Sequence, residues 1–209
     1  MRSSSGRLGA VIDDARPLAV RFTPATWQWH TALVMSGSLL IALCAQVAVP
    51  LPQSPVPVTG QTFAVLLVGA TLGSRLGASA VLTYIIEGMA GLPVWSPGAT
   101  MGVARLAGPT GGYIAGFLIA AFVVGALAEH GWDRRIRTAT FAMLIGELTI
   151  YAIGLPWLAR FIGPETVLDA GLIPFIPGDI YKVVLAAVAL PLAWLVTRKV
   201  RGSPRESSR

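Results

Sequence analysis

Long apolar stretches alternate with short polar or Gly/Pro-rich segments along most of the chain. Several stretches are uncharged over about 18 to 20 residues, which is the length that a helix needs to cross the hydrocarbon core of a bilayer. Proline and glycine cluster between the stretches and interrupt helices there. The pattern predicts six helices: 31–49, 63–73, 78–91, 111–128, 138–158 and 179–197.

The second apolar stretch, 63–73, is short for a membrane span. Its helix therefore begins inside the preceding connector, 50–62, or does not cross the full thickness of the bilayer. That connector is uncharged, and its prolines and Gly60 are expected to prevent regular structure. Gln61 and Thr62 offer hydrogen bonds at its end.

Composition decides the class of protein. Hydrophobic residues make up 54% of the chain and charged residues 12%, and the mean hydropathy is +0.68. These values leave too few polar groups to cover a water-soluble globule, so we expect an all-α integral membrane protein. The single cysteine, Cys44, lies inside the first apolar stretch, which excludes an intrachain disulfide and a CxxC site.

The formal charge of +6 is interpreted as a signal of orientation in the membrane rather than of nucleic-acid binding. The basic residues are scattered singly and form no stripe with interleaved aromatic residues. With six spans, all but three of the 16 Lys and Arg residues fall on the side that carries both termini and the turns 73–77 and 129–137. Basic residues mark the cytoplasmic side, so both termini are expected there. The connectors 50–62, 92–110 and 160–178 then lie together outside.

This topology divides the chain into three parts. Residues 1–30 are rich in Ser, Gly and Arg and form a cytoplasmic N-terminal tail. Residues 31–197 form the six-helix transmembrane domain, and residues 198–209 form a basic cytoplasmic tail. The expected location is the cytoplasmic (inner) membrane, in a multi-pass arrangement.

Two opposite charges lie near the start of the last predicted helix. Pro174 and Pro177 prevent a helix until about Gly178, so Asp179 is predicted as the N-cap. Lys182 follows three residues later on the same face. A charge in an apolar helix is costly, so the pair is either a structural ion pair or part of a ligand site at the outer mouth of the bundle.

Three further charged residues have open roles. Glu87 and Glu147 each serve as a ligand contact, as a protonated helix-to-helix hydrogen bond, or in a proton relay. Arg105 is one of two cations in the outer connectors and lies between glycines, where it either contacts a ligand or is solvated. The four residues Tyr84, Glu87, Gly88 and Gly91 form one polar or small stripe on the third helix.

The sequence carries no visible catalytic machinery. It has no Ser/His/Asp grouping, and segment 108–113, GPTGGY, lacks the lysine of a phosphate loop. Thr110 in that segment is predicted as a helix N-cap. We therefore expect neither an enzyme nor a metal site, and any ATP hydrolysis belongs to another chain.

Three collinear strings resemble the BioY family: PVPVTGQTFAVLLVGATLG at 55–73, GPTGGY followed by IAGF from 108, and PFIPGDIYK at 174–182. BioY proteins are the biotin-specific S components of energy-coupling factor (ECF) transporters. The resemblance covers residues 31–197. It implies a six-helix bundle that binds biotin at the outer face and associates with a transmembrane coupling subunit and cytoplasmic ATP-binding subunits. Biotin is then the transported ligand, and no cofactor is expected.

The resemblance also implies roles for individual residues. Asp179 and Lys182 match the family's residues for the ureido ring, whose N–H donors and C=O acceptor fit a carboxylate and an ammonium. Arg105 is the first candidate for the valerate carboxylate, and Thr100 replaces a polar amide that relatives often carry. The remaining candidates for biotin binding are Gln61, Tyr84, Trp95, Tyr113, Glu147 and Tyr151.

Small residues on the first helix suggest a surface for the coupling subunit. Ser38 and Ala42 form a small-xxx-small pair with Ala45 close by, which either lets a partner helix approach or packs inside the bundle. Two functions from other classes remain alternatives. An autonomous proton-driven carrier of a small vitamin-like molecule would use Glu87, Glu147 and Asp179, and a membrane-embedded enzyme would need a nucleophile or metal set.

Overall fold

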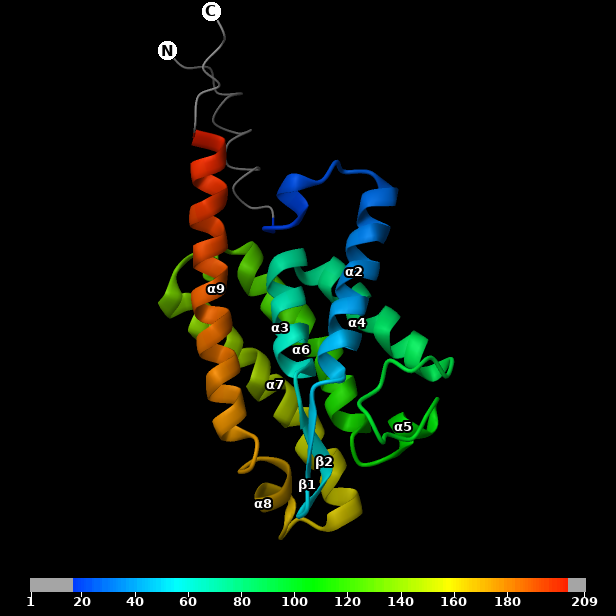
Figure 1. Cartoon of the computed structure of the whole chain (residues 1–209). Coiled ribbons are helices and arrows are strands. Elements are labelled where there is room, and N and C mark those ends of the chain that lie inside the picture. The colour runs from blue at the N-terminus through cyan, green and yellow to red at the C-terminus, as the bar shows by residue number, and fades with distance from the viewer. Residues whose placement is uncertain (1–16, 203–209) are drawn as a thin grey trace, which may run out of the picture.

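The computed structural model describes residues 17–202, in which helices predominate (Figure 1). Residues 1–16 and 203–209 of the two predicted tails lie outside this range. Six main helices correspond to the six predicted ones: α2 (Trp27–Ala45), α3 (Gln61–Leu72), α4 (Ser74–Met89), α6 (Gly111–Glu129), α7 (Ile136–Ile162) and α9 (Ile176–Gly202). Four short helices lie before or between them: η1 (Val20–Phe22), α5 (Ala104–Ala107), η2 (Trp132–Arg134) and α8 (Val167–Gly171).

Four helices of the described range are long and apolar enough to cross a membrane: α2, α6, α7 and residues Ile176–Thr197 of α9. Helix α3 has 12 residues and α4 has 16, which is shorter than the roughly 20 residues of a full span. These two helices meet at Gly73, whose φ of +84° strongly favours glycine. The predicted turn 73–77 is therefore a single-residue break, and α4 begins earlier than expected.

The connector 50–62 forms a β-hairpin, so the prediction that it lacks regular structure was wrong. Strands β1 (Ala48–Leu51) and β2 (Ser54–Thr59) pair antiparallel, with Ala48 opposite Thr59 and an irregularity between Val49 and Leu51. Each strand of a two-stranded hairpin has an outer edge, where the missing N–H of a proline removes no ladder hydrogen bond. The fold is helical with this one small sheet in the described residues.

Helix α6 forms the centre of the bundle and packs against α3, α4 and α7. Glycines allow backbones to approach closely at these contacts. A Cβ atom at Gly69 of α3 would lie 2.6 Å from the carbonyl oxygen of Ala121. At Gly116 of α6 it would lie 3.0 Å from the Cα atom of Ile150. Small residues therefore set the spacing of the central helices.

Polar contacts join the two predicted inner turns to each other and to the C-terminal half of α9. The Glu129 carboxylate accepts hydrogen bonds from the backbone N and the hydroxyl of Ser74, at 2.8 and 2.9 Å. The indole Nε1 of Trp194 donates to Oδ2 of Asp133 at 2.5 Å. The guanidinium group of Arg21 lies 4.7 Å from the centroid of the Trp194 ring, and that of Arg134 lies 4.8 Å from it.

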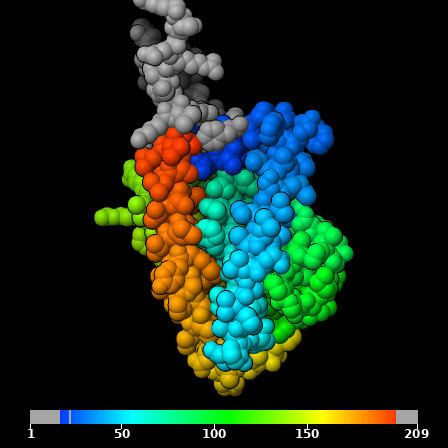
Figure 2. Space-filling model, viewed as in Figure 1, coloured from blue at the N-terminus to red at the C-terminus, as the bar shows by residue number. Residues whose placement is uncertain are grey.

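The three predicted outer connectors lie together at the opposite end of the molecule. Figure 1 shows the hairpin, α5 and α8 at one end, and the start of α2 and the last turns of α9 at the other. Figure 2 shows the hairpin lying between α9 and the segment that precedes α5 on this face. The connectors therefore gather around the first turns of α9.

Candidate functional site

A partly open cavity lies beneath the three connectors. It is bounded by the hairpin, α5, the first turns of α3, α6 and α9, and the middle of α7. The lining side chains combine a few polar groups with an apolar wall, as is typical of small-molecule sites. They are Val56, Pro57, Thr59, Gln61, Thr62, Arg105, Thr110, Tyr113, Ile114, Phe117, Glu147, Ile150, Tyr151, Phe175, Asp179 and Lys182.

Asp179 lies in the first turn of α9 and is not its N-cap. The helix begins at Ile176, and the backbone N–H of Asp179 donates to the carbonyl of Phe175 at 2.9 Å. The prediction of a later start was wrong because Pro177 is tolerated in a first turn, where its missing N–H removes no intrahelical bond. The carboxylate still lies near the positive end of the helix.

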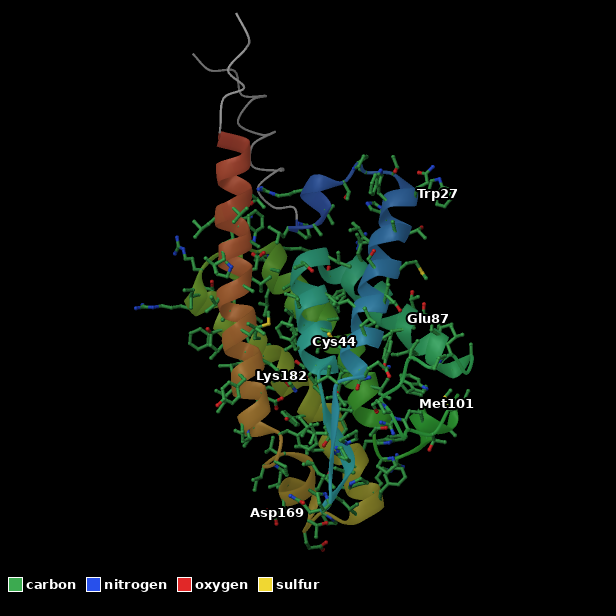
Figure 3. All side chains as sticks on the ribbon, in the orientation of Figure 1. Trp27, Cys44, Glu87, Met101, Asp169 and Lys182 are labelled. Atoms are coloured by element: carbon green, nitrogen blue, oxygen red, sulfur yellow. The ribbon has the colours of Figure 1, made fainter. Side chains whose placement is uncertain are left out.

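A connected network fixes the Asp179–Lys182 pair. Lys182 Nζ lies 3.1 Å from Asp179 Oδ1 and 2.8 Å from the hydroxyl of Thr62 on α3. The hydroxyl of Tyr151 on α7 donates to the second oxygen, Oδ2, of Asp179. The exposed fractions of the Lys182 and Asp179 side chains are 15% and 12%. Three helices thus hold one mostly buried ion pair at the cavity wall, and Figure 3 labels Lys182 on α9.

Gln61 connects the cavity to a second layer of aromatic side chains. Its Oε1 accepts a hydrogen bond from Thr59 at 2.9 Å, and its Nε2 donates to the hydroxyl of Tyr84. Tyr84 and Trp95 are buried in edge-to-face contact with ring centroids 5.1 Å apart. These two rings lie behind the cavity lining and support Gln61 rather than forming the wall itself.

Arg105 supplies a cation from α5, in the connector that the sequence predicts to be outside. Its Nη2 donates to the hydroxyl of Ser96 at 3.1 Å, which orients the side chain toward the cavity. Burial lowers the pKa of the guanidinium from its ordinary value, and the nearby Tyr84 opposes that shift. Arginine has so high a pKa that it stays charged. The cavity therefore carries a positive group on α5 in addition to Lys182.

Tyr113 and Tyr151 form the aromatic part of the wall. Their rings meet edge to face with centroids 6.3 Å apart, and the Tyr113 hydroxyl donates to the carbonyl of Gly171 at 2.9 Å. This hydrogen bond connects α6 to α8. Aliphatic and aromatic side chains complete the wall: Val56, Pro57, Ile114, Phe117, Ile150 and Phe175.

Two buried polar groups of the lining make no hydrogen bond to any part of residues 17–202. One is the carboxyl group of Glu147 on α7, which is 5% exposed, and the other is the hydroxyl of Thr110, which is also 5% exposed. Thr110 is at the predicted N-cap position of α6, but its hydroxyl makes no capping hydrogen bond. Both groups are available to a molecule in the cavity.

Seven of the ten residues predicted for ligand binding line this cavity: Gln61, Arg105, Tyr113, Glu147, Tyr151, Asp179 and Lys182. Tyr84 and Trp95 lie behind it, as described above. Thr100 is exposed in the loop between α4 and α5 and does not line the cavity, so the structure does not place it with the others. In a loop, no regular spacing of side chains indicates which of several neighbouring residues faces a site.

The lining also contains residues that the sequence-based prediction missed. The sequence indicates Thr62 only as a hydrogen-bonding side chain at the end of the connector. In the structure its hydroxyl accepts a hydrogen bond from Lys182, which lies 120 positions away in the sequence. Phe175 lies in the PFIPGDIYK string, four residues before Asp179. The signal for Thr62 was its position beside Gln61 at the start of an apolar helix, and for Phe175 its place in a motif.

The small residues predicted for a coupling interface are buried within the bundle. The exposed fractions of Ser38, Ala42 and Ala45 are 0%, 9% and 0%, on a helix that packs against α4. Ser38 donates to the carboxylate of Glu87 at 2.5 Å. The structure therefore matches the alternative of internal packing for this row and a helix-to-helix hydrogen bond for Glu87, which Figure 3 labels on α4.

Within residues 17–202, no group of three or more His, Cys, Asp or Glu side chains is placed to hold a metal ion.

Comparison with known proteins decides the family. The family model described as "BioY family" matches residues 19–199. The chain belongs to the BioY family. A probable biotin transporter BioY of Pyrococcus horikoshii is 41% identical over 159 residues, covering 76% of this chain and 92% of the relative. The biotin transporter BioY of Rhizobium etli is 38% identical over 160 residues, covering 73% and 85%.

A solved structure shares the fold of this BioY chain. It is described as the S-component for biotin from an ECF-type ABC transporter, and it matches with a TM-score of 0.69 at 24% sequence identity. The match covers 86% of this chain and 96% of the other. The chain therefore has an S-component fold, and its curated relatives are membrane transporters rather than enzymes.

Proposed function

We propose that this BioY chain binds biotin from the outer side of the cytoplasmic membrane and serves as the substrate-binding subunit of an ECF-type transporter. The observation that carries the proposal is the buried Asp179–Lys182 pair, fixed by Thr62 and Tyr151 at the wall of the cavity. The names of the curated relatives and of the structural neighbour support biotin as the ligand.

The polar groups of the cavity match those of biotin. The ureido ring offers two N–H donors and one C=O acceptor, which suit a carboxylate that only accepts and an ammonium that only donates. Asp179 accepts one hydrogen bond on each oxygen, and a carboxylate has about four acceptor sites, so it keeps capacity for the ring. The apolar wall suits the thiophane ring and the aliphatic chain.

Arg105 is proposed to bind the valerate carboxylate. It enters the cavity from the outer loop, on a different element from Asp179 and Lys182. An arginine can hold a carboxylate with two parallel hydrogen bonds. This arrangement places the ring near α9 and the acidic end of biotin near α5.

The proposed topology has six membrane-crossing helices with both termini cytoplasmic. It rests on the distribution of Lys and Arg, which separates the basic termini and inner turns from the outer connectors. Grouping of the outer connectors around the cavity supports it. The two short helices α3 and α4 are proposed to cross where the bilayer thins locally or where neighbouring helices cover their ends.

The energy for uptake is proposed to come from a transmembrane coupling subunit and cytoplasmic ATP-binding subunits. The sequence contains no phosphate-loop lysine motif with which the chain itself could bind ATP. A second candidate, an autonomous proton-coupled carrier, is favoured by one observation, the buried Glu147 in the cavity. Uptake by cells that lack all ECF coupling and ATP-binding subunits distinguishes the two, because only the carrier would continue.

Equilibrium binding to the purified protein tests the ligand. We expect saturable binding of biotin, weaker binding of the valerate amide, and loss of binding when the ureido ring is opened. Asp179→Asn and Lys182→Ala should each weaken binding by about 2 to 5 kcal/mol, because each leaves the other charge unpaired beside the ligand. The matched control is Asp169→Asn, at an exposed acid on α8 that Figure 3 labels far from Lys182.

Two results would contradict this proposal. One is the absence of saturable biotin binding below about 1 μM, which corresponds to roughly 8 kcal/mol. The other is normal binding by folded Asp179→Asn and Lys182→Ala variants, which would leave the pair a purely structural role.

A further inference from the structure

Glu147 is the one carboxyl group in the cavity lining that makes no hydrogen bond to any part of the described chain. It lies on α7, one turn before Tyr151, so the rise of a helix places the two residues about 6 Å apart along the axis. Both of its carboxyl oxygens are buried, and the side chain lines the cavity. An ionised carboxylate without donors is costly in such a place.

The donors around Glu147 have other partners. On α9, Lys182 donates to Asp179 and to Thr62 of α3. The hydroxyl of Tyr151 donates to Asp179, and the Tyr113 hydroxyl on α6 donates to the carbonyl of Gly171. The remaining charged or titratable lining residue, Arg105 on α5, is bonded to Ser96.

The charge balance of the cavity also disfavours ionised Glu147. Asp179 and Glu147 are two carboxyl groups beside a single ammonium, Lys182, which already pairs with Asp179. A second negative charge would be repelled by Asp179 in a region of low effective dielectric. Bound biotin would strengthen both effects, because it excludes water from the cavity and brings a carboxylate of its own.

We propose that Glu147 binds a proton together with biotin, so that the occupied site contains Glu147 as a neutral carboxylic acid. The proton comes from solvent and adds to one carboxylate oxygen of Glu147; no other bond forms or breaks. This inference rests on the proposed function for the identity of the ligand. The protonated acid gains one O–H donor, which matches the acceptor oxygens of the ligand.

Thermodynamic linkage gives the direction of the effect. If biotin favours protonation of Glu147, then protonation favours biotin by the same factor. As far as Glu147 is concerned, affinity is therefore highest below the pH at which the empty site titrates, and the apparent Kd rises by up to about tenfold per pH unit above it. The same coupling does not require that a proton gradient drives transport.

Calorimetry in buffers of different ionisation enthalpy measures the protons taken up with biotin. For the full-length protein in detergent, we expect uptake approaching one proton per biotin as the pH is raised. Glu147→Gln mimics the neutral acid, so its Kd for biotin should no longer follow pH and its proton uptake should be lost. Glu165→Gln, at an exposed acid before α8, is the matched control and should behave like the wild type.

Three outcomes of this titration would overturn the inference. They are the absence of proton uptake by the wild type up to the highest pH at which it stays folded, unchanged uptake by Glu147→Gln, and loss of biotin binding by a folded Glu147→Gln variant. The last result would mean that the ligand needs the ionised carboxylate.

Infrared difference spectra report the protonation of carboxyl groups directly, both with and without biotin. We expect a band of a protonated carboxyl group in the wild type that grows when biotin is added and that is missing in Glu147→Gln. If biotin does not bind but the band is present and pH-dependent, the proposed function fails while a proton site at Glu147 is supported. If biotin binds and the band never appears, the inference fails and the proposed function stands.

Discussion

Lys182 shows how single side chains define the proposed site. Its ammonium is held by two acceptors from different helices, the Asp179 carboxylate on α9 and the Thr62 hydroxyl on α3. The two contacts leave one of its three donors for a ligand. The position of that donor depends on Thr62 as much as on Asp179, because the flexible lysine side chain has many rotamers and both contacts are needed to select one.

Thr62→Val tests this role at the residue scale. The substitution keeps the shape of the side chain and removes the acceptor, so Lys182 loses one of its two fixed contacts. Hydrogen bonds to charged groups contribute about 1.5 to 3 kcal/mol, so the Kd for biotin should rise at least roughly tenfold. Titration of purified protein with biotin provides the measurement.

Thr71→Val on the same helix is the matched control. The Thr71 hydroxyl bonds only to backbone carbonyls of its own helix, at Leu67 and Val68, and does not line the cavity. It should bind biotin like the wild type. If Thr62→Val also binds normally, Thr62 does not position Lys182.

At the scale of the elements, close helix packing depends on positions without side chains. Helices α3 and α6 meet where Gly69 faces the backbone of Ala121, and an added Cβ would lie 2.6 Å from a carbonyl oxygen and 3.0 Å from a Cα atom. Backbone cannot move aside as a flexible side chain does. The start of α3 carries Gln61 and Thr62, so the same contact also positions part of the cavity wall.

Gly69→Ala is expected to lower the free energy of unfolding by about 1 to 3 kcal/mol through overpacking. Gly178→Ala in α9 is the control, since its Cβ would meet only Val58 Cγ1, at an ordinary distance of 3.6 Å. Both changes gain similar helix propensity. Unfolding in detergent should show a loss for Gly69→Ala alone, and equal stability of the two variants would contradict the packing argument.

At the scale of the whole molecule, charge separates the two ends. The end that carries η1, η2 and the last turns of α9 holds Arg21, Arg134 and the Trp194 contacts, whereas the opposite end holds the connectors over the cavity. The asymmetry of basic residues predicts that the first end faces the cytoplasm. On this prediction the cavity opens outward, as the proposed capture of biotin requires.

Cysteine labelling in intact cells tests this orientation. In a Cys44→Ser background, Gln53→Cys places a thiol in the exposed hairpin turn, and Arg137→Cys places one at the exposed start of α7. A membrane-impermeant maleimide should label the first variant in whole cells and the second only after permeabilisation. The reverse pattern would mean that the cavity opens to the cytoplasm.

Much of the element order could be predicted, because apolar length and the positions of Gly and Pro are local properties. The six helices were expected in the right order, and the Asp179–Lys182 pair was expected at the outer end of the last one. The first turn of α9 was misplaced because two prolines indicated a later start, although Pro177 fits inside a first turn. The hairpin was not predicted because prolines are unfavourable in strands. In a two-stranded hairpin, however, each strand has an unpaired outer edge where a proline is tolerated.

Composition and spacing are enough to predict the membrane class, the order of the helices and the chemical character of the site, because they are read without knowing any long-range contact. Which residues share the cavity follows from the packing of the bundle. It joined Thr62 to Lys182 across 120 positions, placed Thr100 outside, and buried Ser38 against Glu87. The physical reason is that the rotation and spacing of packed helices follow from side-chain fit over the whole bundle, which no local pattern contains.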